Sequence, residues 1–132
     1  MRNSVLDSYA VLAFLFQERG YATVRDLLAK AAQTKHPLFI SAPNWAEIRY
    51  RMEQRLGEGG WQLARQKLSG LPLEVVPADQ ALAELAGEIK VTKKMPLADC
   101  FAVALAKQRN AHIYTGDREF RAVEKEVRVV WL

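Results

Sequence analysis

The sequence has 132 residues, of which 50% are hydrophobic and 26% charged. These values are typical of a globular domain, and the chain is long enough to bury one hydrophobic core. The single cysteine, Cys100, excludes an intrachain disulfide and fits a reducing compartment. No apolar run approaches the ~20 residues that a membrane span needs, and the first residues do not resemble a signal peptide. We therefore expect one cytoplasmic domain over residues 1–132. The net charge of +4 permits a polyanionic partner without indicating one.

Short apolar runs alternate with helical patterns along the chain. Strands are expected at 3–6, 38–40, 73–76, 111–115 and 127–131, and helices at 8–16, 21–33, 43–56, 61–68, 80–89, 96–109 and 118–123. The glycine-rich residues 57–60 are expected to separate two helices, and residues 90–94 to form a basic loop. Strands that alternate with helices favour a parallel sheet with helices on both faces. We therefore predict an α/β fold, a three-layer α/β/α arrangement with a central parallel sheet of about five strands.

The stretch NSVLDSYAVLAFL, at residues 3–15, places one carboxylate between the first expected strand and the first expected helix. This carboxylate is Asp7. Open parallel sheets bind ligands at the carboxyl ends of their strands, which is where Asp7 would lie. Aspartate is also a good helix N-cap. The residue alone therefore does not decide between capping and ligand binding.

Asp99 is the only charged residue in LADCFAVALA, at residues 97–106. A helix that is apolar on every side is buried, and a buried carboxylate either has a dedicated partner or becomes protonated. The alternative is a favourable interaction with the dipole at the start of the helix. We favour a functional role because the rest of the segment is apolar.

Glu47 and Asp117 have ordinary explanations when each is considered alone. Glu47 could pair with Arg51 one helical turn later, and Asp117 in IYTGDREF could be a turn aspartate. In the predicted fold, however, Asp7 and Asp117 both follow strand carboxyl ends. Glu47 and Asp99 lie in early turns of helices that start from the same edge. The four carboxylates are therefore expected to converge.

Four carboxylates in one cleft repel one another, and some of their pKa values rise unless a cation neutralises them. Carboxylate oxygens are hard ligands that suit Mg²⁺ or Mn²⁺. Such a site can hold a phosphodiester, activate a water molecule and stabilise the leaving oxygen. The sequence therefore predicts metal-assisted phosphodiester hydrolysis.

Four segments carry a resemblance to a known family: SVLDSYAVLAFL, NWAEIRYR, MPLADCFAVALA and IYTGDREF. In order and approximate spacing they resemble the PIN-domain nucleases, and most of all the VapC toxins of bacterial and archaeal toxin–antitoxin pairs. The resemblance covers essentially the whole chain. It implies a compact α/β/α endoribonuclease that depends on Mg²⁺ or Mn²⁺ and leaves 5′-phosphate and 3′-hydroxyl ends on its RNA. It also implies a homodimer that a cognate antitoxin protein holds inactive.

The resemblance also implies roles for individual residues. Asp7 matches the family's first-strand acid, Glu47 its acid in the helix after the second strand, and Asp99 the acid that opens the late helix. Asp117 matches a fourth acid that varies more across the family, and Thr115 a frequent hydroxyl that orients water or metal. We predict that all five are catalytic and that the four acids bind the metal.

Basic and apolar surfaces are the next candidates for binding. Lys93, Lys94 and Arg118 are expected near the mouth of the acidic cleft, where they could bind RNA phosphates. The apolar faces of residues 8–16 and 21–33 could leave a groove for a helix or strand of the antitoxin.

Other classes of function fit the sequence less well. A phosphatase that forms a phosphoaspartate on Asp7 needs a second acid two residues later, where this chain has Tyr9. A receiver-like domain needs paired acids after its first strand and a lysine after its last, so both fit poorly. A non-catalytic RNA-binding or regulatory α/β module remains the alternative, and the presence of all four acids favours the enzyme.

Overall fold

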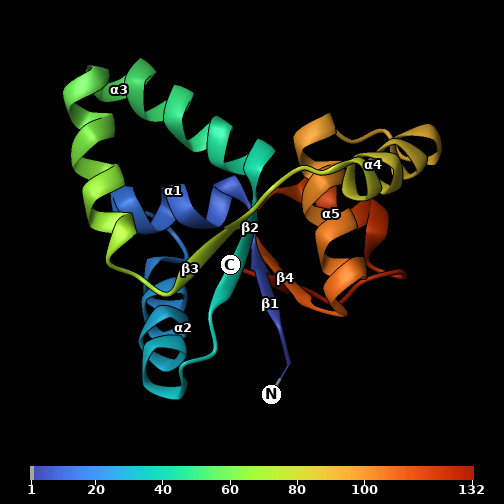
Figure 1. The fold of residues 1–132 in the computed structure, drawn as a ribbon, viewed down its shortest axis with the longest axis horizontal. Helices are drawn as coiled ribbons and strands as arrows, with labels where there is room; N and C mark the ends of the chain where they lie inside the picture. Colours follow the sequence, from blue (N-terminus) through green and yellow to red (C-terminus); the bar gives the residue numbers. More distant parts are fainter. Residues whose placement is uncertain (1) are drawn as a thin grey trace.

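The computed structural model describes residues 2–132 and has strands and helices in alternation (Figure 1). The strands are β1 (Ser4–Leu6), β2 (Leu38–Ser41), β3 (Leu73–Val76), β4 (His112–Thr115) and β5 (Val129–Trp131). The helices are α1 (Ser8–Phe16), α2 (Tyr21–Thr34), α3 (Ala42–Ser69), α4 (Gln80–Thr92), α5 (Leu97–Arg109) and the 3₁₀ helix η1 (Arg118–Val123).

The five strands form one sheet in the order β3-β2-β1-β4-β5, and every neighbouring pair is parallel. The first strand of the chain is therefore the central one, with Val5 opposite Phe39 of β2 and Ile113 of β4. This confirms the predicted parallel sheet. It also means that β1 and β4, which are distant in sequence, end side by side.

Alternate residues of the strands face opposite layers, because successive side chains of a strand point to opposite faces. Val5 belongs to an apolar cluster with α4 and α5, whereas Leu6 belongs to a second cluster with α1, α2 and α3. In Figure 1 these two groups of helices lie on opposite sides of the sheet. The predicted three-layer arrangement is confirmed.

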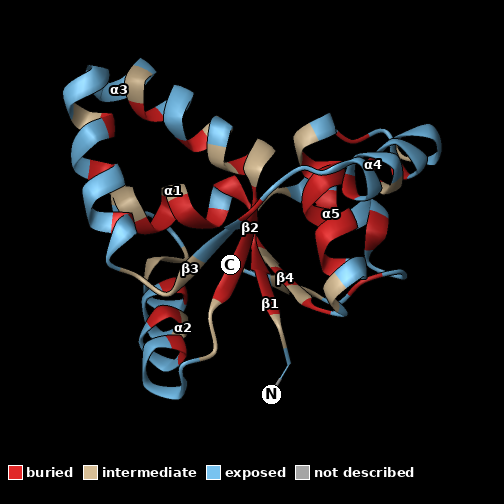
Figure 2. Ribbon diagram, in the orientation of Figure 1, coloured by how far each residue is buried: buried red, intermediate tan, exposed pale blue. Residues whose placement is uncertain are grey.

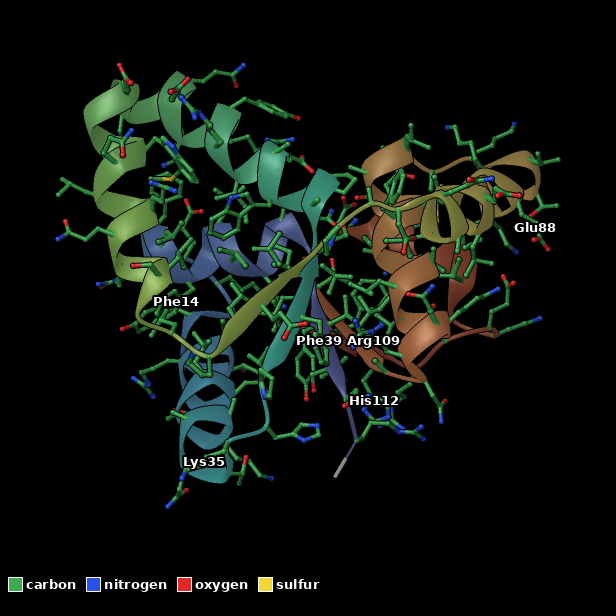
Figure 3. All side chains as sticks on the ribbon, viewed as in Figure 1. Phe14, Lys35, Phe39, Glu88, Arg109 and His112 are labelled. Atoms are coloured by element: carbon green, nitrogen blue, oxygen red, sulfur yellow. The ribbon has the colours of Figure 1, made fainter. Side chains whose placement is uncertain are left out.

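Helix α5 is buried along most of its length, as Figure 2 shows. Its residues from Asp99 to Ala106 are all buried, as expected from their apolar composition. Burying a side chain such as Leu105 contributes about 1.5–3 kcal/mol. At the far end of α5, the Arg109 guanidinium lies over the Phe39 ring, 4.5 Å from its centroid (Figure 3). Helix α5 is thus a rigid support for any side chain at its start.

The structure differs most from the prediction within α3 and at the end of α4. The predicted separation of two helices within residues 57–60 is present, but it takes one residue, because only Gly57 leaves the helical conformation (φ 74, ψ 179). A glycine with positive φ kinks the chain there, and the second segment of α3 continues to Ser69. Helix α4 continues to Thr92, because the Thr92 hydroxyl and the Lys93 N–H both donate to the Ile89 carbonyl and satisfy the helix end. The predicted basic loop is correspondingly shorter.

The carboxyl ends of β1 and β4 and the starts of α1, α3 and α5 meet near the upper end of the sheet in Figure 1. Lys35 and His112 lie at the opposite, lower end (Figure 3). Within residues 2–132, no helix has the length and apolar character that crossing a membrane requires. The side chains expected to be functional therefore belong to one end of the sheet.

Candidate functional site

Asp7 lies between β1 and α1 and is only 1% exposed. Its Oδ1 accepts a hydrogen bond from the Ala10 N–H at 2.9 Å, so it caps α1. Its Oδ2 accepts a hydrogen bond from the Thr115 hydroxyl. The two interpretations of Asp7 therefore do not compete, because one oxygen caps the helix while the other meets the end of β4.

Thr115 joins the ends of two strands. Its hydroxyl donates to Asp7 and accepts the Asp117 N–H at 2.9 Å. Asp117 then caps η1, because its Oδ1 accepts the Glu119 N–H at 3.0 Å. Thr115 is fully buried, so in this arrangement its hydroxyl holds Asp7 and the turn after β4.

Glu47 reaches the same end of the sheet from α3. Its Oε1 accepts a hydrogen bond from the Ser8 hydroxyl at 2.7 Å, and its Oε2 forms an ion pair with Arg51 Nε at 2.9 Å. The expected helical ion pair is thus present. The bond to Ser8, the residue after Asp7, also fixes the carboxylate beside the start of α1.

Asp99 lies in the first turn of α5 and is 5% exposed. Its Oδ2 is buried and has no hydrogen-bond partner within residues 2–132. The start of α5 is tied to α3, because the Asn44 side-chain N–H donates to the Ala98 carbonyl at 3.3 Å and Asn44 in turn contacts the Ser41 hydroxyl. The main chain that carries Asp99 is therefore held in place while one carboxylate oxygen is left without a protein donor.

The two buried acids have strongly raised pKa values. Burial raises the pKa of Asp7 from 3.8 to about 8, against the lowering effect of the Thr115 and Ala10 hydrogen bonds, and the charges of Asp99 and Asp117 raise it further. Burial, and then the charges of Asp117 and Glu47, raise the pKa of Asp99 to about 7. Each buried acid therefore feels the charges of two other acids of the site, and the ionised state of both is unfavourable near neutral pH.

An open cavity of about 290 Å³ adjoins these acids. Glu47, Arg51 and Asp117 line it, whereas Asp7 and Asp99 are not among its lining residues. Apolar side chains of α1, including Tyr9, Leu12 and Phe16, form much of the remaining wall. The Glu18 carboxylate and the Arg55 guanidinium, which pair with each other at 3.8 Å, line it as well. A ligand in this cavity would therefore meet three carboxylates and two guanidiniums directly.

The site fits a divalent metal ion in the type of its donor atoms but not in their spacing. Within residues 2–132, no three His, Cys, Asp or Glu side chains stand close enough to hold an ion in the positions they take here. The donors are nevertheless the carboxylate oxygens that Mg²⁺ and Mn²⁺ prefer, and the buried Asp99 Oδ2 is unpaired. The donor set fits such an ion in kind, and binding one requires the side chains to draw closer.

The comparisons with known proteins agree with the fold. The family model described as the PIN domain matches residues 4–126. This chain belongs to the PIN domain family. No curated protein matches the sequence.

Several solved structures share the fold of this PIN domain at low sequence identity. They include VapBC2 from Rickettsia felis bound to a promoter DNA fragment (TM-score 0.75, 18% identity, 98% of both chains). DNA-bound VapBC from Salmonella typhimurium aligns with a TM-score of 0.76 and 20% identity over 98% of both chains. VapC20 from Mycobacterium tuberculosis, described as a Sarcin-Ricin loop cleaving toxin, aligns with a TM-score of 0.71 and 16% identity, over 92% of this chain and 95% of that one.

The structure adds residues to this PIN-domain site that the sequence did not single out. Ser8 and Asn44 hold the elements that carry Glu47 and Asp99. Ser8 directly follows Asp7, and Asn44 follows the cap Ser41 by three residues, which is a usual position for a cap partner. Both signals were available, but they are too common to indicate a site alone.

The predicted RNA-contacting bases line two different cavities. Lys93 forms an ion pair with Glu126 at 2.9 Å, and Lys93 and Lys94 line a cavity beside Glu119. Arg118 lines another cavity. The prediction that these bases bind RNA stays a prediction.

Proposed function

We propose that this PIN domain is a divalent-metal-dependent endoribonuclease and the toxin component of a toxin–antitoxin pair. The observation that carries the proposal is the approach of four carboxylates from separate elements to one end of the sheet, with a buried Asp99 oxygen left unpaired. A structural role explains the capping bonds of Asp7 and Asp117, but not the burial of two acids beside two others. Buried charge of one sign is very unfavourable unless a cation or protons neutralise it.

In this proposal Asp7, Glu47, Asp99 and Asp117 hold the ion. A divalent cation, when bound, neutralises these charges, polarises a phosphoryl oxygen and lowers the pKa of a water molecule. The raised pKa values of Asp7 and Asp99 support this assignment, because they mean that the ionised carboxylates lack a neutralising positive charge in the metal-free chain. Each pKa unit corresponds to about 1.4 kcal/mol between the two protonation states. A cation that restores the ionised forms must displace protons, so its binding should depend strongly on pH.

The other residues of the site position these acids and meet the substrate. Thr115 orients the Asp7 carboxylate, and Ser8 orients Glu47. The Arg51 side chain both pairs with Glu47 and lines the open cavity, where a guanidinium is suited to a phosphate oxygen.

The solved structures support the choice of partners. The Rickettsia and Salmonella structures are VapBC complexes, and VapC20 is described as cleaving the Sarcin-Ricin loop. We accordingly propose that the substrate of this chain is RNA, that a cognate antitoxin inhibits it, and that it acts as a homodimer in the cytoplasm.

The test is cleavage of single-stranded RNA by the purified chain with Mg²⁺ or Mn²⁺ and with EDTA. We expect endonucleolytic products with 5′-phosphate and 3′-hydroxyl ends, formed only with the metal. Asp99→Asn should abolish cleavage, whereas Glu88→Gln, which changes an exposed acid on α4, should not.

Two results would contradict the proposal. Cleavage that persists in EDTA or in the Asp99→Asn variant would show that another site or a contaminant is responsible. RNA binding without cleavage at any metal concentration would favour the non-catalytic RNA-binding module instead.

A further inference from the structure

A second cavity, of about 440 Å³, lies next to the acidic site. Three arginines from two parts of the chain line it: Arg19 from the turn between α1 and α2, and Arg118 and Arg121 from η1. Tyr9 and Trp131 also belong to its wall. We call this set of five residues the arginine cavity.

The positive charge of the arginine cavity is largely uncompensated. None of its three arginines forms an ion pair with another residue of 2–132. Glu124 is the acidic side chain in the lining, and its Oε2 accepts the Trp131 indole N–H at 3.1 Å. By contrast, Lys93 and Lys107 both bind Glu126. The arginine cavity is therefore suited to an anion that the protein itself does not supply.

The two aromatic rings in the cavity wall are partly open to solvent, with Trp131 39% and Tyr9 38% exposed. The bond from the indole N–H to Glu124 restrains the Trp131 ring at the sheet edge. An exposed aromatic ring beside unpaired arginines is the combination that binds single-stranded nucleic acid, because bases stack on the ring while arginines contact the phosphates. An acidic protein segment would use the arginines but would gain less from the rings.

Tyr9 connects the arginine cavity to the acidic site, because it lines both cavities. Its ring lies directly against the main chain of Gly116, where a Cβ atom would stand 2.2 Å from the Tyr9 Cε1. Gly116 sits between Thr115 and Asp117, so the glycine lets the ring pack beside the acids. A chain that leaves the acidic cavity across Tyr9 would reach the arginines next.

We propose that the arginine cavity is a binding subsite for single-stranded RNA that contacts the backbone phosphates flanking the cleaved bond and stacks a base on Trp131. This inference rests on the proposed function, since it takes RNA as the substrate. It adds the path of the strand, which runs from the carboxylates over Tyr9 to Arg19, Arg118 and Arg121.

The test measures RNA binding in EDTA, so that cleavage plays no part. The probe is a fluorescently labelled oligouridine of about ten nucleotides, a length within the usual range of single-strand sites, and the readout is anisotropy over a series of salt concentrations. We expect the double variant Arg118→Ala/Arg121→Ala to bind roughly tenfold more weakly. Its slope of log affinity against log salt should be less steep by about 0.7 for each lost phosphate contact.

The matched control removes the same charge at the other end of the sheet. Arg2 and Arg128 line a basic cavity beside His112, which lies at the amino end of β4. Arg2→Ala/Arg128→Ala should leave both affinity and salt slope near those of the wild type. An equal loss in the two double variants would show that only net charge matters, and it would overturn the proposal.

The stacking contact is tested at Trp131. Trp131→Leu should weaken oligouridine binding roughly fivefold or more without changing the salt slope, whereas Trp131→Phe should retain most of the affinity. Circular dichroism and thermal unfolding would establish that both variants are folded. If Trp131→Leu and the Arg118/Arg121 double variant both bind RNA as the wild type does, the cavity serves another ligand, such as an acidic protein segment, and the proposal is wrong.

These results can be separated from a failure of the proposed function. A chain that binds oligouridine through the arginine cavity but never cleaves RNA contradicts the nuclease assignment alone. A chain that cleaves RNA with metal but binds it independently of Arg118 and Arg121 contradicts the subsite alone.

Discussion

Two aspartates of this chain make the same local hydrogen bond in different surroundings. Asp7 caps α1 by accepting the Ala10 N–H at 2.9 Å, and Asp79 caps α4 by accepting the Leu82 N–H, also at 2.9 Å. Each stands directly after an apolar strand or the short turn that follows one. As helix caps the two residues are equivalent.

The difference lies beyond the helix that each one caps. Asp79 is exposed to solvent, whereas Asp7 is buried beside Asp99 and Asp117, and its second oxygen is held by Thr115. The cap explains why an aspartate is suitable at either position. Only the neighbours of Asp7 explain why an acid is kept where its charge is unfavourable.

The largest expected effect is on RNA cleavage, which should depend on Asp7 but not on Asp79. Asn caps helices as well as Asp does, so Asp7→Asn and Asp79→Asn should both keep their helices. Asp7→Asn should lower RNA cleavage roughly a thousandfold, because losing several kcal/mol of transition-state stabilisation costs tenfold for every ~1.4 kcal/mol. Asp79→Asn should cleave at the wild-type rate. Initial rates on one RNA substrate measure this, and similar rates in the two variants would refute the distinction.

The next largest effect is on stability: the Asp7 carboxylate that favours cleavage should destabilise the metal-free fold. Because the pKa of Asp7 is raised to about 8 in the folded chain, its stabilising contribution is complete below pH 3.8 and is lost as the pH rises towards 8. The metal-free protein should therefore lose several kcal/mol of unfolding free energy between pH 5 and pH 8, and Asp99 adds to this loss. Asp7→Asn should be more stable than the wild type at pH 8.

Urea unfolding in EDTA at pH 5 and pH 8 measures this effect. The Asp79→Asn variant should show the same pH dependence as the wild type, because it leaves the buried acids in place. A wild-type protein that is equally stable at both pH values would contradict the raised pKa of Asp7.

The smallest effect concerns the hydroxyl that gives Asp7 its distinct surroundings. Thr115→Val removes the donor to Asp7 and leaves the Asp117 N–H without its acceptor, which should cost about 1–3 kcal/mol of unfolding free energy. RNA cleavage should fall as well, because the Asp7 carboxylate loses its orientation. Thr115→Ser keeps the hydroxyl and should recover most of both properties. Calorimetry and cleavage rates on the two variants measure this, and an equally impaired Thr115→Ser would point to packing instead of the hydrogen bond.

Much of the fold could be predicted because its signals are local. The alternation of apolar runs with helical patterns indicated the parallel sheet, and the uniformly apolar residues 97–106 indicated a buried helix. The cluster of glycines at residues 57–60 indicated the break within α3, but not that Gly57 alone would make it. The end of α4 was placed too early, since basic residues suggest a loop but are also suited to a helix carboxyl end.

The candidate site was less predictable than the fold from the individual residues. From the residues alone Asp7, Glu47 and Asp117 each had an ordinary explanation, and each of those explanations is present in the structure as a cap or an ion pair. Only the burial of Asp99 was indicated strongly by its own segment. The predicted parallel fold, and not the residues one by one, indicated that the four acids converge, and the family resemblance implied the same four.

The sequence by itself determined which segments form strands and helices, where they begin, and that an acid stands at each of several junctions. The tertiary structure decided which of those acids meet. The bond from Ser8 to Glu47 spans 39 residues and that from Thr115 to Asp7 spans 108, and no local pattern records such a contact. Capping is settled within one helical turn, whereas the burial and mutual repulsion that distinguish Asp7 from Asp79 exist only after the sheet has brought the ends of β1 and β4 together.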